Sequence, residues 1–133
     1  MRRKTRVVIV DDNVAFLEGI EALLETNDDI EVVAKFTSGK ALLDYSHLNS
    51  IDLILLDVEM PELNGIQTAK LINYQYSRIK IIAITMYQDA VYLTQLIEAG
   101  FLGFVNKTNV SDELFETIET ILKGDLSFPE NIL

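Results

Sequence analysis

Short apolar runs recur along the chain, and each is followed by a longer amphipathic stretch. Several of these runs are rich in valine and isoleucine, which favour extended structure. Runs such as the LILL of residues 53–56 do not alternate polar with apolar residues, so we expect strands that are buried on both faces. The strands are predicted at Arg6–Val10, Glu31–Phe36, Asp52–Leu56, Lys80–Ile84 and Gly103–Asn106.

The intervening stretches carry apolar residues at the spacing of one face of an α-helix. Gly100 and Gly124 each follow such a stretch, at a position where glycine commonly ends a helix. Ser111 is predicted to be the N-cap of the last helix, which would end at Lys123. The other helices are predicted at Val14–Glu25, Gly39–Leu48, Gly65–Tyr76 and Ala90–Ala99.

Strict alternation of strands and helices predicts an α/β fold, a five-stranded parallel sheet that is doubly wound, with helices on both faces. Ligands of such folds bind outside the carboxyl ends of the strands. Polar or ionisable side chains lie at, or just after, the ends of four of the predicted strands. They are Asp11, Asp12, Asp57, Thr85 and Lys107. These residues are therefore expected at one edge of the sheet, although they are far apart in the sequence.

The composition fits one soluble folded domain, residues 1–133, because 49% of the residues are hydrophobic and 24% are charged. The absence of cysteine excludes disulfides and thiolate metal sites. No apolar run is long enough to span a membrane, and the N-terminal MRRKTR is not followed by the core of a signal peptide. We therefore expect a cytoplasmic protein without a membrane partner.

The formal net charge of -10 argues against DNA binding by this chain itself. Residues 1–5 form a basic N-terminal arm, which is expected to be solvated. Residues 124–133 are expected to trail off as a C-terminal tail or as the start of a linker.

Carboxylates gathered at one sheet edge repel one another, and a divalent cation would relieve that repulsion. Oxygen ligands with few protein donors suit Mg²⁺. Lys107 could reach a phosphate oxygen, and Thr85 could donate a hydrogen bond. This set of side chains predicts phosphoryl transfer to Asp57, which would form an acyl phosphate.

Four motifs in this order resemble the receiver domain of a two-component response regulator: VVIVDDN, LILLDVEMPELNG, IIAIT and GFVNK. The resemblance covers nearly the whole chain. The segments ITMY, LIEAGFLGFVNK and SDELFETIETILKGDLSFPENI further resemble the LuxR/NarL-type branch, whose receivers precede a helix-turn-helix domain. The resemblance implies a flavodoxin-like (βα)5 fold with strand order 2-1-3-4-5.

The resemblance also implies that Asp57 takes a phosphoryl group from a phosphohistidine of a sensor histidine kinase. Mg²⁺ would be held by Asp12, Asp57 and the backbone carbonyl of Glu59, with Asp11 acting directly or through water. The domain would catalyse only its own phosphorylation and dephosphorylation, and would not be an enzyme for other substrates.

The same resemblance assigns a switch. Lys107 would pair with the phosphoryl group, and Thr85 would swing inward to bond it. Phe104 would follow Thr85 from exposed to buried, although a core aromatic without a switching role remains the alternative for Phe104. The surface that changes would comprise the fourth helix, the fifth strand and the fifth helix. Met86 stands where many receivers have a smaller residue and is expected to narrow access to Asp57.

Several other functions remain open. An FMN binder shares the topology but would meet Asp11 and Asp12 where its phosphate loop belongs. An aspartyl-nucleophile phosphatase would have only Glu59 as its second acid, and a receiver that is not phosphorylated could serve as a binding module. A phosphorylated receiver would control a DNA-binding output domain absent from this chain, contact DNA only through that domain, and could form a receiver homodimer. The alternative is a stand-alone receiver that acts through protein contacts.

Overall fold

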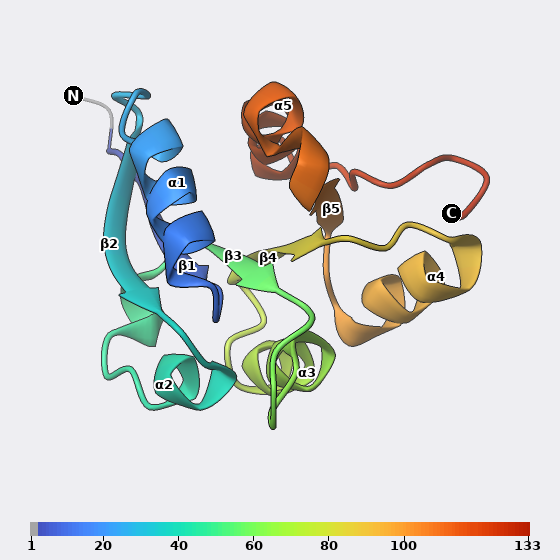
Figure 1. Ribbon diagram of the computed structural model, residues 1–133, viewed down its shortest axis with the longest axis horizontal. Coiled ribbons are helices and arrows are strands. Elements are labelled where there is room, and N and C mark those ends of the chain that lie inside the picture. Colours follow the sequence, from blue (N-terminus) through green and yellow to red (C-terminus); the bar gives the residue numbers. More distant parts are fainter. Residues whose placement is uncertain (1–2) are drawn as a thin grey trace.

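Five parallel strands form one sheet in the order β2-β1-β3-β4-β5, as predicted (Figure 1). The computed structural model describes residues 3–133, so the first two residues of the predicted basic arm lie outside the described part. Each strand begins and ends within one residue of its expected bounds. The strands are β1 (Thr5–Val10), β2 (Ile30–Phe36), β3 (Leu53–Asp57), β4 (Lys80–Thr85) and β5 (Gly103–Asn106).

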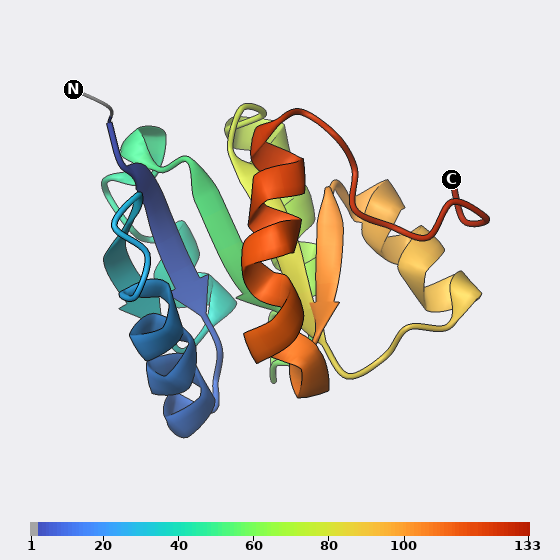
Figure 2. The same cartoon turned by 90° about the horizontal axis from the view of Figure 1, so that it is seen from above.

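Helices cover both faces of the sheet because successive strand residues point to opposite sides. Val7 and Ile9 of β1 pack into a cluster with α1 and α5, while Val8 and Val10 pack into a second cluster with α2, α3 and α4 (Figures 1 and 2). All four side chains are at most 1% exposed. The helices are α1 (Val14–Leu24), α2 (Gly39–Leu43), α3 (Gly65–Gln75), α4 (Ala90–Ala99) and α5 (Val110–Leu122).

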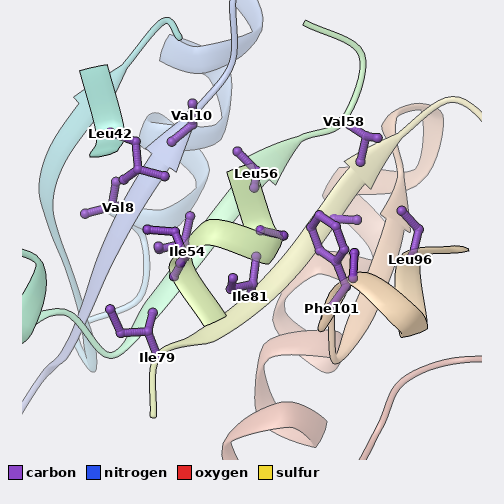
Figure 3. Packing of buried hydrophobic residues seen from close by; sticks show 14 of the residues in the cluster. Val8, Val10, Leu42, Ile54, Leu56, Val58, Ile79, Ile81, Leu96 and Phe101 are labelled. Carbon is purple, nitrogen blue, oxygen red and sulfur yellow. The ribbon is translucent and has the colours of Figure 1, made fainter. Parts of the chain in front are cut away.

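The second cluster joins three helices to the middle of the sheet. Leu42 of α2 lies beside Val8 of β1, Ile54 and Ile81 lie at the middle of the sheet, and Phe101 lies between Ile81 and Leu96 of α4 (Figure 3). All of these side chains are at most 1% exposed. The strand ends are therefore held in fixed positions by a core on each side of the sheet.

Two helix boundaries differ from the prediction by more than one residue. Helix α2 ends at Leu43 instead of continuing to Leu48, which a separate 3₁₀ turn at Leu48–Ser50 buries in the core. The prediction that Ser111 is the N-cap of α5 is wrong. The side chain of Asn106 accepts a hydrogen bond from the Thr108 backbone N–H at 3.0 Å and begins a 3₁₀ turn that runs directly into the helix. Ser111 therefore lies inside α5.

Residues 124–133 pack back onto the edge of the sheet (Figure 2). The Ser127 backbone N–H donates to the Leu102 carbonyl at 2.8 Å, and Ser127 forms a parallel bridge with Gly103. A Cβ atom at Gly103 would lie 2.9 Å from the Ser127 Cβ, so this approach requires the glycine. Phe128 is 9% exposed and stacks on Phe104 with 5.8 Å between ring centroids. The segment does not simply trail off, because Phe128 joins the core.

Within residues 3–133, none of the helices combines the length and the apolar character that crossing a membrane requires.

Candidate functional site

The carboxyl edge of the sheet brings together all of the side chains that were expected there. Asp11 and Asp12 follow β1, Asp57 ends β3, Thr85 ends β4 and Lys107 follows β5. One carboxylate oxygen from each of Asp11, Asp12 and Asp57 lies within 4.8 Å of the others. Asp11 and Asp57 are 1% and 0% exposed, whereas Asp12 is exposed to solvent. The acids thus form a cluster of two buried members and one exposed member, Asp12.

Lys107 supplies the positive charge at this cluster. Its ammonium lies 3.2 Å from Asp57 Oδ1 and 3.3 Å from Asp11 Oδ2. The ring of Phe16 lies 5.0 Å from the same nitrogen, in a cation–π contact. Burial on its own would lower the pKa of Lys107, but the charges of Asp57 and Asp11 outweigh it and raise that pKa above its ordinary value. The lysine is therefore held, fully protonated, between the two buried acids.

Asp57 is poorly satisfied as a carboxylate. Neither of its oxygens has a hydrogen-bond partner among the described residues, and the same holds for Asp11 Oδ2. Burial, followed by the nearby charge of Asp11, raises the pKa of Asp57 to about 7, although Lys107 acts in the opposite direction. The other Asp11 oxygen accepts the Asn13 backbone N–H at 2.8 Å. Of these three buried oxygens, Asp57 Oδ1 and Asp11 Oδ2 have only the Lys107 ammonium nearby, and Asp57 Oδ2 has no hydrogen-bond partner among the described residues. Such oxygens fit a hard divalent cation with oxygen ligands, such as Mg²⁺.

The loop after Asp57 depends on a glycine. The Gly65 backbone N–H donates to the Val58 carbonyl at 2.9 Å, and a Cβ atom at Gly65 would lie 2.5 Å from the Asp57 carbonyl oxygen. A larger residue at position 65 would therefore push the loop away from the acid cluster. Glu59 lies on this loop, exposed to solvent, two residues after Asp57.

Thr85 does not contact Asp57 through its hydroxyl. The Thr85 Oγ1 donates to Glu59, at 3.0 Å from Oε2 and 3.3 Å from Oε1, and lies 3.1 Å from the Tyr92 hydroxyl. Tyr92 also donates a short hydrogen bond to Glu59 Oε2. No pattern in the sequence indicated Tyr92, because an aromatic residue in the first turn of a helix is commonly a packing residue. The Glu59 side chain thus connects the end of β4 to α4.

Phe104 lies on β5 and is only half-buried. Its ring packs against the core on the α4 side of the sheet and stacks on Phe128. Phe104, which was expected to move together with Thr85, is therefore partly covered by the C-terminal segment of the same chain.

A doubly wound parallel sheet with an acid cluster, a lysine and a threonine at its carboxyl edge defines the class of phospho-accepting receiver domains. Residues 7–119 match the family described as the response regulator receiver domain, and the chain belongs to that family. Its homologues are transcriptional regulators of the LuxR/NarL type, as the motifs predicted.

Two curated relatives illustrate the match. The chain is 30% identical over 131 residues to the Fimbriae Z protein of Escherichia coli K12, covering 98% of this chain and 62% of that protein. It is 31% identical over 128 residues to the transcriptional regulatory protein YdfI of Bacillus subtilis, covering 96% of this chain and 60% of YdfI. The chain thus spans about three fifths of the length of these relatives.

Solved structures agree with this assignment. A LuxR-family two-component response regulator from Aurantimonas superposes with a TM-score of 0.88 at 27% identity, covering 97% of this chain and 92% of that one. The isolated receiver domain of RcsB from Salmonella enterica, solved with the phosphomimetic BeF3-, gives a TM-score of 0.86 at 26% identity, covering 98% and 96%. The predicted fold class is confirmed.

Proposed function

We propose that Asp57 accepts a phosphoryl group from a phosphohistidine of a sensor histidine kinase, in a Mg²⁺-dependent step. The observation that carries this proposal is the pair of buried Asp57 oxygens without hydrogen-bond partners, beside two further acids and the Lys107 ammonium. One Asp57 oxygen would form the new bond to phosphorus while the bond from phosphorus to the donor imidazole nitrogen breaks. The product would be an acyl phosphate on the protein.

Asp11, Asp12 and Asp57, with the backbone carbonyl of Glu59, are the residues that would hold Mg²⁺. Bound Mg²⁺ would supply the positive charge that offsets the repulsion between the acids and the incoming phosphoryl oxygens. The Lys107 ammonium would stay between Asp11 and Asp57 and pair with a phosphoryl oxygen, because it already lies 3.2 Å from Asp57 Oδ1. The domain would act on its own phosphoryl group and on no separate substrate.

Phosphorylation would act on the rest of the molecule through Thr85. To bond a phosphoryl oxygen, the Thr85 hydroxyl must leave Glu59 and turn toward Asp57. A change from mostly inactive to mostly active needs about 5.5 kcal/mol of differential interaction. Charge-assisted hydrogen bonds of roughly 1.5–3 kcal/mol each, from Thr85 and Lys107, could provide it. Phe104 and the surface of α4, β5 and α5 would then change together.

We further propose that the switch controls a DNA-binding output domain attached beyond this chain. Its support is that the chain spans about three fifths of relatives that are transcriptional regulators. The acidic net charge of -10 favours DNA contact through such a domain and not through the receiver. A receiver homodimer is also proposed, since one similar structure is described as RcsB dimers bound to DNA. The alternative is a stand-alone receiver that acts through protein contacts.

We also propose a cytoplasmic location, which the cysteine-free sequence supports.

Labelling with acetyl phosphate tests the acceptor directly. Intact-mass spectrometry should show one phosphoryl group per chain in the presence of Mg²⁺ and none with a chelator. Asp57→Asn should abolish the label, whereas Asp52→Asn, which removes an acid at the other end of the same strand, should retain it. Absence of labelling in the unaltered chain would contradict the proposal and favour a receiver used only for binding. A bound yellow chromophore would favour an FMN binder, and turnover of p-nitrophenyl phosphate would favour a phosphatase.

A further inference from the structure

The Glu59 carboxylate gathers hydrogen bonds from three donors on neighbouring elements. It accepts from the Thr85 hydroxyl at 3.0 Å, from the Tyr92 hydroxyl in a short bond, and from the Met86 backbone N–H at 3.4 Å. Thr85 Oγ1 in turn accepts from the Tyr87 backbone N–H at 3.2 Å. The loop after β3, the end of β4 and the first turn of α4 therefore meet at this carboxylate.

The Thr85 hydroxyl has only one proton to donate. It can direct that proton to Glu59 or to the Tyr92 oxygen, which lies 3.1 Å away. In either arrangement the Thr85 hydroxyl donates its hydrogen bond to Glu59 or Tyr92 and not to Asp57. The Asp57 oxygens have no hydrogen-bond partner among the described residues. A bond from Thr85 to a phosphoryl group on Asp57 would require this proton to be withdrawn from Glu59 and Tyr92.

Tyr92 is well placed to hold Glu59. Its helix begins two residues earlier, capped by the Asp89 side chain, which accepts the Tyr92 backbone N–H at 3.3 Å. Its ring packs against Tyr87 with 5.5 Å between centroids. The Tyr92 side chain is partly buried, and its hydroxyl donates to Glu59 Oε2 in a short hydrogen bond.

We propose that Tyr92 is a positioning residue, and that with Glu59 it forms a latch that retains Thr85 in the unphosphorylated arrangement. This inference rests on the proposed function of Asp57 as the phosphoryl acceptor. The latch competes with the phosphoryl group for the Thr85 hydroxyl, so it sets how strongly a phosphoryl group must bind to switch the domain. Departure of Thr85 also removes one of the contacts of Tyr92, and thereby links the acceptor site to the first turn of α4.

Tyr92→Phe tests the latch because it removes the hydroxyl and keeps the ring that packs on Tyr87. We expect this variant to bind beryllofluoride with Mg²⁺ about fivefold more tightly, the equivalent of one hydrogen bond. Tyr74→Phe is the matched control, since Tyr74 is 90% exposed on α3, and its affinity should stay unchanged. Calorimetric titration of the full chain measures both. Equal or weaker binding by Tyr92→Phe, relative to Tyr74→Phe, would overturn the latch.

Two further readouts separate the latch from a general effect on packing. In a Thr85→Ala background, adding Tyr92→Phe should bind beryllofluoride no more tightly than Thr85→Ala alone, because the residue on which the latch acts is missing. In the metal-free protein, amide exchange at Met86 should be faster in Tyr92→Phe than in Tyr74→Phe, because Glu59 is held less firmly. A gain in affinity that persists without Thr85, or unchanged Met86 exchange, would overturn the proposal.

Failure of the proposed function gives a different result. If the unaltered chain bound no beryllofluoride in the presence of Mg²⁺, the acceptor role of Asp57 would be wrong, and the latch would be wrong with it. If the unaltered chain bound the analogue and Tyr92→Phe behaved like Tyr74→Phe, only the latch would be wrong.

Discussion

Two aspartates bracket β3, and their surroundings are opposite. Asp52, just before the strand, accepts a hydrogen bond from the Arg3 guanidinium at 2.7 Å and another from the Arg6 backbone N–H at 2.8 Å. Asp57, the last residue of the strand, is fully buried and accepts no hydrogen bond from the described residues. The same strand therefore carries a satisfied carboxylate at one end and an unsatisfied one at the other.

The two pKa values follow from this difference. Partial burial on its own would raise the pKa of Asp52, but the hydrogen bonds from Arg3 and Arg6 outweigh it and lower that pKa below its ordinary value. Burial and the charge of Asp11 raise the pKa of Asp57 to about 7. The fold can satisfy a carboxylate at the end of β3, as Asp52 shows. Among the described residues Asp57 has only the Lys107 ion pair and no hydrogen bond, which marks a place kept open for a ligand and not a limit of the architecture.

Lys107→Ala should have the largest effect at the unsatisfied end. The substitution removes the only ammonium paired with Asp57 in residues 3–133, so the rate of labelling by acetyl phosphate should fall about 100-fold. Intact-mass measurements on samples quenched at successive times give this rate. Lys40→Ala is the control, because Lys40 pairs with Asp44 on the surface. Labelling of Lys107→Ala within twofold of the control rate would contradict the role assigned to the lysine.

Asp57→Asn should stabilise the metal-free protein. An acid whose pKa is raised on folding destabilises the folded state above that pKa, and the effect fades as pH falls from about 7 toward the ordinary aspartate value. We expect a gain of order 2 kcal/mol in unfolding free energy at pH 8, which disappears near pH 4. Urea unfolding followed by circular dichroism measures it. A loss of stability at pH 8 would show that Asp57 is satisfied after all.

Asp52→Asn should have the opposite sign. An acid whose pKa is lowered on folding stabilises the folded state above its unfolded value, and this contribution disappears as pH falls through the lower folded value. We expect a loss of about 1 kcal/mol at pH 7, small because the Arg3 side chain is 67% exposed. The same urea series at pH 7 and in acid checks it. A gain in stability at pH 7 would remove the contrast between the two ends.

Met86→Ala should give the smallest effect. The Met86 side chain follows Thr85 and is 51% exposed at the acceptor end of the sheet. If the Met86 side chain narrows access to Asp57, truncating it should speed labelling by acetyl phosphate about threefold. That increase corresponds to a decrease of less than about 1 kcal/mol in the activation free energy. Stability should change little. An unchanged labelling rate would show that Met86 does not limit access.

Most of the fold could be predicted from hydrophobic pattern alone, because β1, β3 and β4 are buried on both faces over most of their length and their apolar runs have clear ends. The errors arose where a local hydrogen bond or a tertiary contact overrode the predicted element. The 3₁₀ turn begun by Asn106 displaced the expected N-cap at Ser111. The docking of the C-terminal segment was not predicted, because Phe128 meets Phe104 only through tertiary packing, and no periodic pattern marks that contact.

The membership of the acid cluster could also be predicted, because parallel strands bring their carboxyl ends to one edge. The orientation of side chains within it could not. Glu59 was expected to give its backbone carbonyl to the metal, or its carboxylate as the second acid of a phosphatase, but its side chain turns to Thr85 and Tyr92. The direction taken by an exposed glutamate depends on donors from elements distant in sequence. Tyr92 lies seven residues after Thr85, in a helix where its spacing indicates only packing.

The most direct test of the contrast is a ¹³C NMR titration of the Asp52 and Asp57 carboxyl carbons in the metal-free protein. We expect the Asp57 carboxyl to titrate near pH 7 and the Asp52 carboxyl to titrate below the ordinary aspartate value. Added Mg²⁺ should lower the midpoint of Asp57 and leave that of Asp52 unchanged. Ordinary midpoints for both carboxyls, with no response to Mg²⁺, would contradict it.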